Sequence, residues 1–73
     1  MWLYKSPIGN IYIKRLRDGR YGIVFDGEVW ESCSSPQAAA DDVFTQSTGC
    51  SDWDLHDTAG IIVPTDLSEW ERI

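Results

Sequence analysis

Two Asp-Gly pairs, Asp18-Gly19 and Asp26-Gly27, constrain the fold of this chain more than any other feature. Each pair lies between runs rich in β-branched and aromatic residues, and this pattern is typical of a β-hairpin with a two-residue turn. We therefore expect strands over about 9–17, 20–25 and 28–33. Two tight hairpins in series predict a three-stranded antiparallel meander.

Two-residue turns also fix the register of the strands, and the register decides which side chains share a face. The first turn would place Arg17 opposite Arg20, and the second would place Ile23 opposite Trp30. One face then carries an apolar set that we expect to form the core: Tyr12, Leu16, Tyr21, Ile23, Phe25 and Trp30. The other face is half apolar and half basic, with Ile11, Ile13, Val24, Val29 and Cys33 beside Arg15, Arg17 and Arg20. If nothing covers the Ile13-Val24-Val29 face, we expect dimerisation through it or through an edge strand.

A helix over about 36–47 is the expected cover for the aromatic face. Ser35 has the residue type of an N-cap, and Pro36 suits the first helical position because its missing N–H would have no partner there. Small and apolar residues recur at helical spacing on one side: Ala39, Ala40, Val43 and Phe44. Gly49 provides a C-terminal stop.

The last third of the chain is less regular. The segment 51–55 predicts a short strand or a turn that buries Trp53 and Leu55, and 61–63 predicts a short strand. A final helical turn is expected over about 66–72.

These elements predict a single domain over residues 1–73 with an α+β fold. The expected architecture is a three- to four-stranded antiparallel meander, with one helix packed on its aromatic face and a short C-terminal helical turn. A fourth strand would come from 61–63 or from the N-terminal segment.

Charge is distributed unevenly along the chain. The total is −6, from 6 basic and 12 acidic residues, and this total argues against a general nucleic-acid binder. Residues 1–25 hold five basic residues and one acid (net +4), whereas residues 26–73 hold one basic residue and eleven acids (net −10). Four of the six basic residues surround the first hairpin turn: Lys14, Arg15, Arg17 and Arg20. These four are the candidates for contacting an anion or nucleic acid, with Tyr12 or Tyr21 placed to stack on a base. The alternative is that they pair with the acidic half of the chain or protect a sheet edge.

Acidic residues and tryptophans are the candidates for a protein interface. Five aspartates form a charged set that could dock on a basic partner or imitate nucleic acid: Asp41, Asp42, Asp52, Asp54 and Asp57. The alternative is that they only keep the surface soluble. Trp2 and Trp70 are the candidates for exposed interface anchors, and the alternative is that the tryptophans fill the core of a small domain.

The residue types used for catalysis and metal binding do not form a recognised constellation. His56, the single histidine, has Asp54 and Asp57 nearby, but the chain has no Gly-x-Ser-x-Gly nucleophile turn. Cys33, Cys50 and His56 do not have zinc-ligand spacing. We therefore predict a protein that is not an enzyme and uses no cofactor or metal.

The sequence also bears on the cellular compartment. No apolar run approaches the roughly 18 residues of a membrane span, and the N-terminal residues do not have the pattern of a signal peptide. We therefore expect a cytoplasmic protein without a membrane partner, in which Cys33 and Cys50 stay reduced and buried. The alternative for the two cysteines is a disulfide or a redox pair.

Residues 26–55 resemble a known domain family. They contain Asp26-Gly27, Ser34-Ser35-Pro36, the alanines at 38–40, Thr48-Gly49 and Trp53. This order is similar to the RAMA domain, a small domain associated with restriction enzymes and adenine methylases. That family has a glycine turn and strand, a Ser-Pro-Ser-type helix cap, an alanine pair and a strand bearing a tryptophan. Where the family shows Asn-Gly-Trp, this chain has Cys50-Ser51-Asp52-Trp53. The resemblance implies a DNA-related role as an appendage of larger proteins.

The sequence as a whole predicts a small non-catalytic interaction module that binds a protein partner. The alternative is a nucleic-acid-associated accessory domain that contacts phosphates through the basic hairpin. Such binding would be weak, because four cations close to many acids release few counterions from nucleic acid. We expect a monomer or a weak homodimer.

Overall fold

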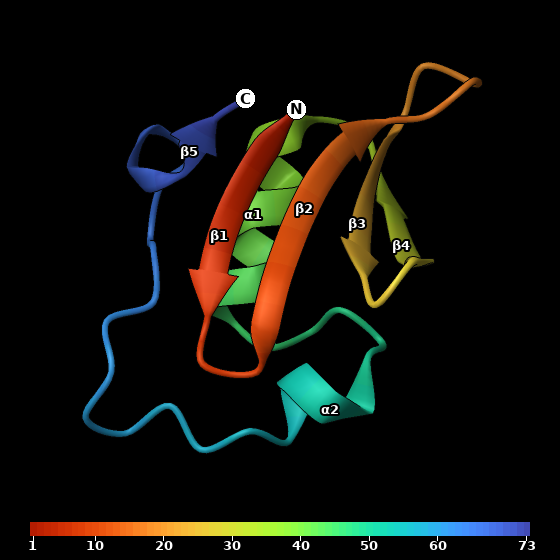
Figure 1. Cartoon of the computed structure of the whole chain (residues 1–73). Helices are drawn as coiled ribbons and strands as arrows, with labels where there is room; N and C mark the ends of the chain where they lie inside the picture. The colour runs from red at the N-terminus through yellow and green to blue at the C-terminus, as the bar shows by residue number, and fades with distance from the viewer.

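The computed structural model describes every residue from Met1 to Ile73 and contains a five-stranded antiparallel sheet with the order β4-β3-β2-β1-β5. Its elements, in chain order, are β1 (Trp2–Ser6), β2 (Gly9–Arg15), β3 (Tyr21–Phe25), β4 (Glu28–Cys33), α1 (Pro36–Phe44), α2 (Ser51–Asp54), the 3₁₀ helix η1 (Leu67–Glu69) and β5 (Glu71–Arg72). Helix α1 packs behind the sheet, and no element lies in front of it (Figure 1). The predicted α+β fold is confirmed. The N-terminal segment supplies the fourth strand, β5 adds a fifth, and 61–63 forms none.

The second Asp-Gly pair forms the predicted two-residue turn. Asp26 and Gly27 both have positive φ, at 54° and 77°. A type I′ turn requires this at both central residues, and it matches the twist of the strands that it joins. Phe25 therefore pairs with Glu28, as such a turn requires.

The first Asp-Gly pair forms a different turn, and the predicted register there is wrong. Only Gly19 has positive φ, at 84°, and its N–H donates to the Leu16 carbonyl at 3.1 Å. The Leu16 N–H donates to the Arg20 carbonyl at 2.7 Å, so the loop holds three residues instead of two. Arg15 pairs with Tyr21 as a result, and Arg17 does not pair with Arg20.

This one-residue shift reverses the two faces of β2, because side chains alternate along a strand. The face under α1 carries Ile11 and Ile13 together with Ile23, and Tyr12 points to the opposite face with Val24. The expected Ile13-Val24-Val29 face therefore does not exist. The buried core is built from both layers and includes Ile11, Ile13, Ile23, Cys33, Ala39, Ala40, Val43, Cys50, Trp53 and Trp70.

A β-bulge corrects the expectation for Trp30. Ile23 pairs with Glu31 and Val24 with Val29, so Trp30 is the extra residue of the bulge and does not face Ile23. Its indole Nε1 donates to the Phe25 carbonyl at 3.1 Å. Trp30 therefore stays exposed, and Glu31 turns toward the helix layer.

Helix α1 begins where the sequence predicts. The Ser35 hydroxyl accepts a hydrogen bond from the Ala38 N–H at 3.1 Å, with Pro36 at the first position. The helix ends at Phe44 instead of at about 47, and Gly49 is not its stop: the chain turns earlier, at Gln46, whose φ of 56° is in the left-handed region. Phe44 lies exposed at the end of the helix instead of in the expected apolar stripe, because its side of the last turn faces away from the sheet.

Candidate interaction surface on the sheet

One face of the sheet has no covering layer, and we call its side chains the uncovered face: Met1, Leu3, Lys5, Asn10, Tyr12, Lys14, Leu16, Arg20, Val24, Val29, Ser32 and Glu71. A single cross-strand row runs over all five strands on this face, in the order Glu71, Leu3, Tyr12, Val24 and Val29. Side chains directly opposite one another on a sheet lie in contact distance. The middle of the uncovered face is therefore a continuous apolar row from Leu3 to Val29, with Glu71 at its β5 end.

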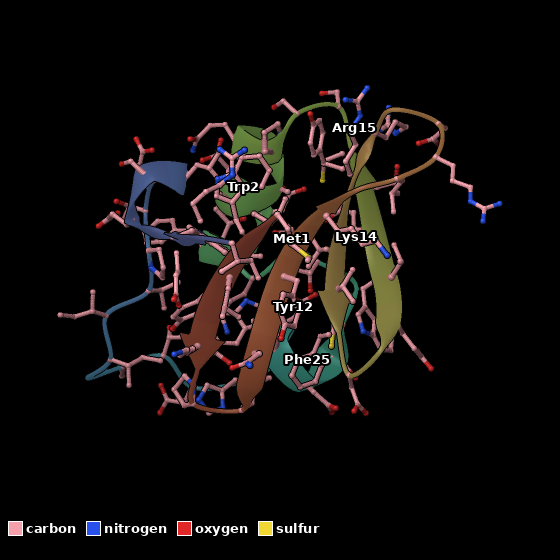
Figure 2. All side chains as sticks on the ribbon, turned by 45° about the horizontal axis from the view of Figure 1, so that its top comes forward. Met1, Trp2, Tyr12, Lys14, Arg15 and Phe25 are labelled. Atoms are coloured by element: carbon pink, nitrogen blue, oxygen red, sulfur yellow. The ribbon has the colours of Figure 1, made fainter.

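The apolar row is only partly withdrawn from water. Val29 keeps 53% of its surface exposed, Met1 is also exposed, and Tyr12 and Val24 are half-buried, whereas Leu3 is only 8% exposed. Gly22 lies beneath Leu16 and Val29, and a Cβ there would come within 3.0 Å of each. Since glycine has no side chain, Leu16 and Val29 close over it and extend the apolar surface. Figure 2 shows Met1, Tyr12 and Lys14 together on this side of the sheet.

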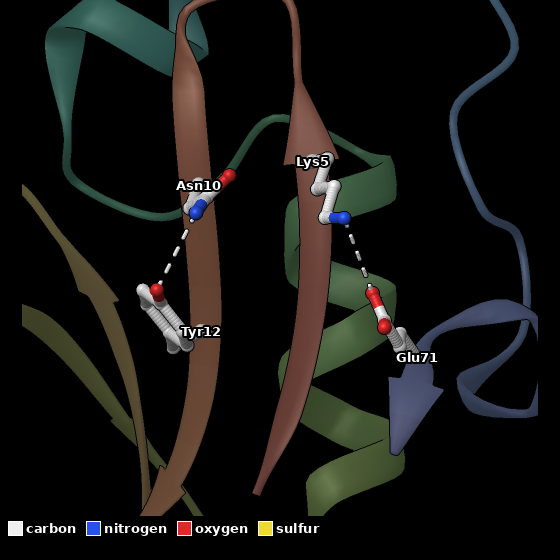
Figure 3. Close-up of polar contacts among 4 residues, drawn as sticks. All are labelled: Lys5, Asn10, Tyr12 and Glu71. Atoms are coloured by element: carbon white, nitrogen blue, oxygen red, sulfur yellow. Dashed lines mark hydrogen bonds and ion pairs between the residues drawn. The ribbon is translucent and has the colours of Figure 1, made fainter. Parts of the chain in front are cut away.

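Charged groups lie on both sides of the apolar row. Lys5 Nζ is 3.9 Å from Glu71 Oε2, and the Asn10 amide donates to the Tyr12 hydroxyl at 3.4 Å (Figure 3). Lys14 lies on the other side of the row and has no ion pair. The single carboxylate of the uncovered face is thus already paired, whereas Lys14 is a free cation.

The structure separates the four basic residues of the first hairpin. Lys14 lies on the uncovered face, and Arg15 is on the opposite face with Tyr21. Arg17 is in the three-residue loop, and Arg20 is held at the edge of the sheet. The Arg20 guanidinium donates from Nε to the Ser32 hydroxyl at 2.7 Å and from Nη2 to the Ser32 carbonyl at 2.9 Å. Three of the predicted nucleic-acid contacts therefore share the uncovered face: Tyr12, Lys14 and Arg20, whose guanidinium reaches the Ser32 side chain there.

The two tryptophans expected as interface anchors lie elsewhere. Trp70 is 5% exposed and packs against Tyr4, with ring centroids 5.6 Å apart, so it fills the core instead of forming an anchor. Trp2 is half-buried on the α1 side of the sheet, edge-on to Tyr21. The Arg72 guanidinium covers the Trp2 ring at 4.8 Å from its centroid.

Asp41 and Asp42, the two helix aspartates among those expected at an interface, have different surroundings. Asp41 is exposed and accepts a hydrogen bond from the Gln37 amide at 2.9 Å. Asp42 is half-buried, and its Oδ2 accepts from the Cys33 thiol at 3.6 Å. Asp41 alone is therefore on the outer surface.

A cluster of possible metal ligands lies on the α1 side of the sheet and consists of Glu31, Cys33 and Asp42. The sequence did not predict this cluster, because the β-bulge is what places Glu31 on that side. The ligand atoms of these residues lie within 4.8 Å of one another, so this is the set that could approach one cation, without a fourth protein ligand. Burial, the hydrogen bond to Asp42 and the Asp42 charge raise the pKa of Glu31. Burial and the charges of Glu31 and Asp42 raise the pKa of Cys33 to about 11, so Cys33 is a thiol at neutral pH. Cys33 and Cys50 are both buried and free.

The residues behind the family resemblance have structural partners here. Asp54 Oδ1 accepts from the Thr48 N–H at 3.0 Å and from the Thr48 hydroxyl at 2.7 Å, and Oδ2 accepts from the Gly49 N–H at 2.8 Å. The Trp53 indole donates to the Val43 carbonyl at 2.9 Å, and Trp53 is buried in α2. Leu55, expected to be buried with Trp53, is 83% exposed because the one-turn helix presents it to water. The Asp54 carboxylate thus stabilises the loop before α2 through these hydrogen bonds, and it makes no hydrogen bond or ion pair with His56.

No pocket opens on the molecule, so the candidate site is a surface. Comparisons with family models, curated proteins and solved structures found no match for this chain. The resemblance to the RAMA domain stays a prediction. None of the helices has the length and apolar character needed to cross a membrane.

Proposed function

We propose that this protein is a small non-catalytic interaction module that binds a protein partner through the uncovered face. The observation that carries the proposal is the apolar row across four strands, from Leu3 on β1 to Val29 on β4, on the side of the sheet that α1 does not cover. An antiparallel sheet can face water on one side, but that side then alternates to polar residues. Here Leu3, Tyr12, Val24 and Val29 form an unbroken row in the middle of that side, with polar residues around it. The accessible part of this row runs from Tyr12 through Val24 to Val29, and accessible apolar surface of this kind marks interaction sites.

The sheet edges are poorly suited to adding a partner strand. On β4, Arg20 occupies the Ser32 carbonyl, and the bulge at Trp30 interrupts the ladder. The Gly49 backbone lies against the Trp30 carbonyl, where a Cβ would be 3.5 Å from the oxygen. On the other side, β5 has only two residues. Since bulges, capped carbonyls and short strands protect edges from pairing, the face is the better docking surface.

The separation of the basic residues favours a protein over a nucleic acid. Binding to single-stranded nucleic acid combines several backbone-contacting cations with several aromatic stacking platforms. The uncovered face offers one aromatic ring, Tyr12, and two cations without an ion pair, Lys14 and Arg20. Arg15 is on the other face, and Arg20 is already bound to Ser32.

The proposal is tested by selecting binders without assuming their sequence. A displayed library of random 16-residue peptides is selected on the full chain, and the recovered peptides are assayed against two variants. Val29→Ser removes apolar surface from the uncovered face, and Leu55→Ser removes a comparable exposed side chain from another surface. We expect recovered peptides to lose at least fivefold in affinity for the first variant and less than twofold for the second. Peptides that respond equally to both variants, or no specific peptides at all, would overturn the proposal.

A further inference from the structure

We infer that the protein segment recognised by the uncovered face is acidic, with a carboxylate placed against Lys14 beside its apolar side chains. The inference rests on the proposed function and names its partner chemistry. Lys14 is two residues along β2 from Tyr12, so it stands about 7 Å to one side of the apolar row. A partner that covers the row also takes water from the Lys14 ammonium. An interfacial cation that loses water without gaining a counter-charge weakens binding.

The other charges on the uncovered face determine which way the partner segment lies across the row. Glu71 ends the row at β5 and already pairs with Lys5, so that end has no unpaired charge. The row from Leu3 to Val29 crosses three strand spacings, or about 14 Å. The matching segment therefore has apolar side chains over about 14 Å, a carboxylate beside the middle of that stretch, and no carboxylate at the β5 end.

A second copy of this chain does not supply the required charge. Two uncovered faces placed together bring four lysines, two Lys5 and two Lys14, against two Glu71 carboxylates. The Lys5–Glu71 pair is exposed and 3.9 Å long, so each Glu71 can serve one lysine or the other but not both. Two ammonium groups would therefore be buried without a counter-charge. An acidic segment of another protein is thus the better occupant.

Neighbouring residues on opposite faces provide a matched test of this inference. Lys14→Glu and Arg15→Glu make the same change in net charge at adjacent positions, but only Lys14 lies on the uncovered face. The same random 16-residue library is selected on the wild-type chain and on both variants, each first shown to be folded by its amide NMR spectrum. The net charge of the recovered peptides is then compared with that of the unselected library.

We expect wild type and Arg15→Glu to recover peptides enriched in Asp and Glu, and Lys14→Glu to recover neutral or basic ones. A synthesised peptide that was selected on the wild-type chain should lose at least fivefold in affinity for Lys14→Glu and less than twofold for Arg15→Glu.

Peptides that depend on Val29 but show no acidic bias would overturn this inference and leave the proposed function standing. Equal losses in the two charge variants would also overturn it, because a general charge effect would then explain the binding. Binding of a 12-residue oligothymidylate that both variants abolish would overturn the inference and the proposed function together, in favour of nucleic acid at the hairpin. If peptide binding is absent and wild type forms a dimer that Val29→Ser dissolves, the occupant is a second copy and the inference is wrong.

Discussion

Asp54→Ala is predicted to be the most damaging single change to a polar side chain of this protein. The Asp54 carboxylate accepts three hydrogen bonds from the loop before α2, two from Thr48 and one from Gly49. Thr48 is only 2% exposed, so water cannot reach its backbone N–H and hydroxyl once the carboxylate is gone. The Gly49 N–H is exposed and can bond to water instead.

The size of the loss follows from the two Thr48 donors, the backbone N–H and the hydroxyl, that are left without an acceptor. A buried donor left without a partner costs about 1–3 kcal/mol, so we expect Asp54→Ala to lower the free energy of unfolding by roughly 3 kcal/mol. Domains of this size have total stabilities at the lower end of about 5–15 kcal/mol, so the loss would be a large share of the total. Asp54→Asn keeps one acceptor oxygen and should lie between wild type and alanine.

Urea denaturation followed by tryptophan fluorescence measures this effect directly. Asp52→Ala is the matched control, because Asp52 is an exposed aspartate in the same short helix without a hydrogen bond or ion pair. The control should shift stability by less than about 0.5 kcal/mol. If the two alanine variants are equally stable, Asp54 does not fasten the loop, and this reasoning is refuted.

Two further predictions concern the core. Because burial and Asp42 raise the pKa of Glu31, the folded state holds this proton more tightly than the unfolded chain. The stabilisation from Glu31 is therefore complete below its unfolded pKa of about 4.3 and is lost as pH rises through the higher folded pKa. Urea denaturation at a series of pH values should show that Glu31→Gln removes this decline; an unchanged pH profile would contradict the pairing. In thermal denaturation, Trp53→Phe should lower the free energy of unfolding by about 1 kcal/mol more than Trp70→Phe does. The reason is that the Trp53 indole donates to the Val43 carbonyl, whereas the buried Trp70 indole N–H has no partner. Equal losses in the two variants would contradict this assignment.

The two Asp-Gly pairs show how far local sequence determines this sheet. The same dipeptide forms a two-residue turn at Asp26-Gly27 and the end of a three-residue loop at Asp18-Gly19. Both turn types accept glycine with positive φ, so the dipeptide predicts a hairpin without predicting its loop length. Strand β2 has apolar residues on both faces, with Ile13 on one and Tyr12 on the other. Hydrophobic alternation therefore could not decide the register.

The candidate site was predictable only in part. Because successive side chains along a strand point to opposite faces, Lys14 and Arg15 must lie on different faces in any register. Which of them shares a face with Val24 depends on the extra loop residue, and no local pattern marks that residue. The pairing of Glu71 with Leu3 joins opposite ends of the chain and also has no local signature. The ends of the apolar row were therefore visible only in the folded structure.

An NMR titration tests most directly whether the uncovered face is the partner surface. The full chain, labelled with ¹³C and ¹⁵N, is titrated with one synthesised peptide from the library selection, and methyl shifts are followed to saturation. The account predicts that the methyl groups of Leu3, Val24 and Val29 shift together with one dissociation constant, while those of Ala39 and Ala40 beneath the sheet do not. Shifts confined to the three-residue hairpin loop or to the outer side of α1 would contradict it.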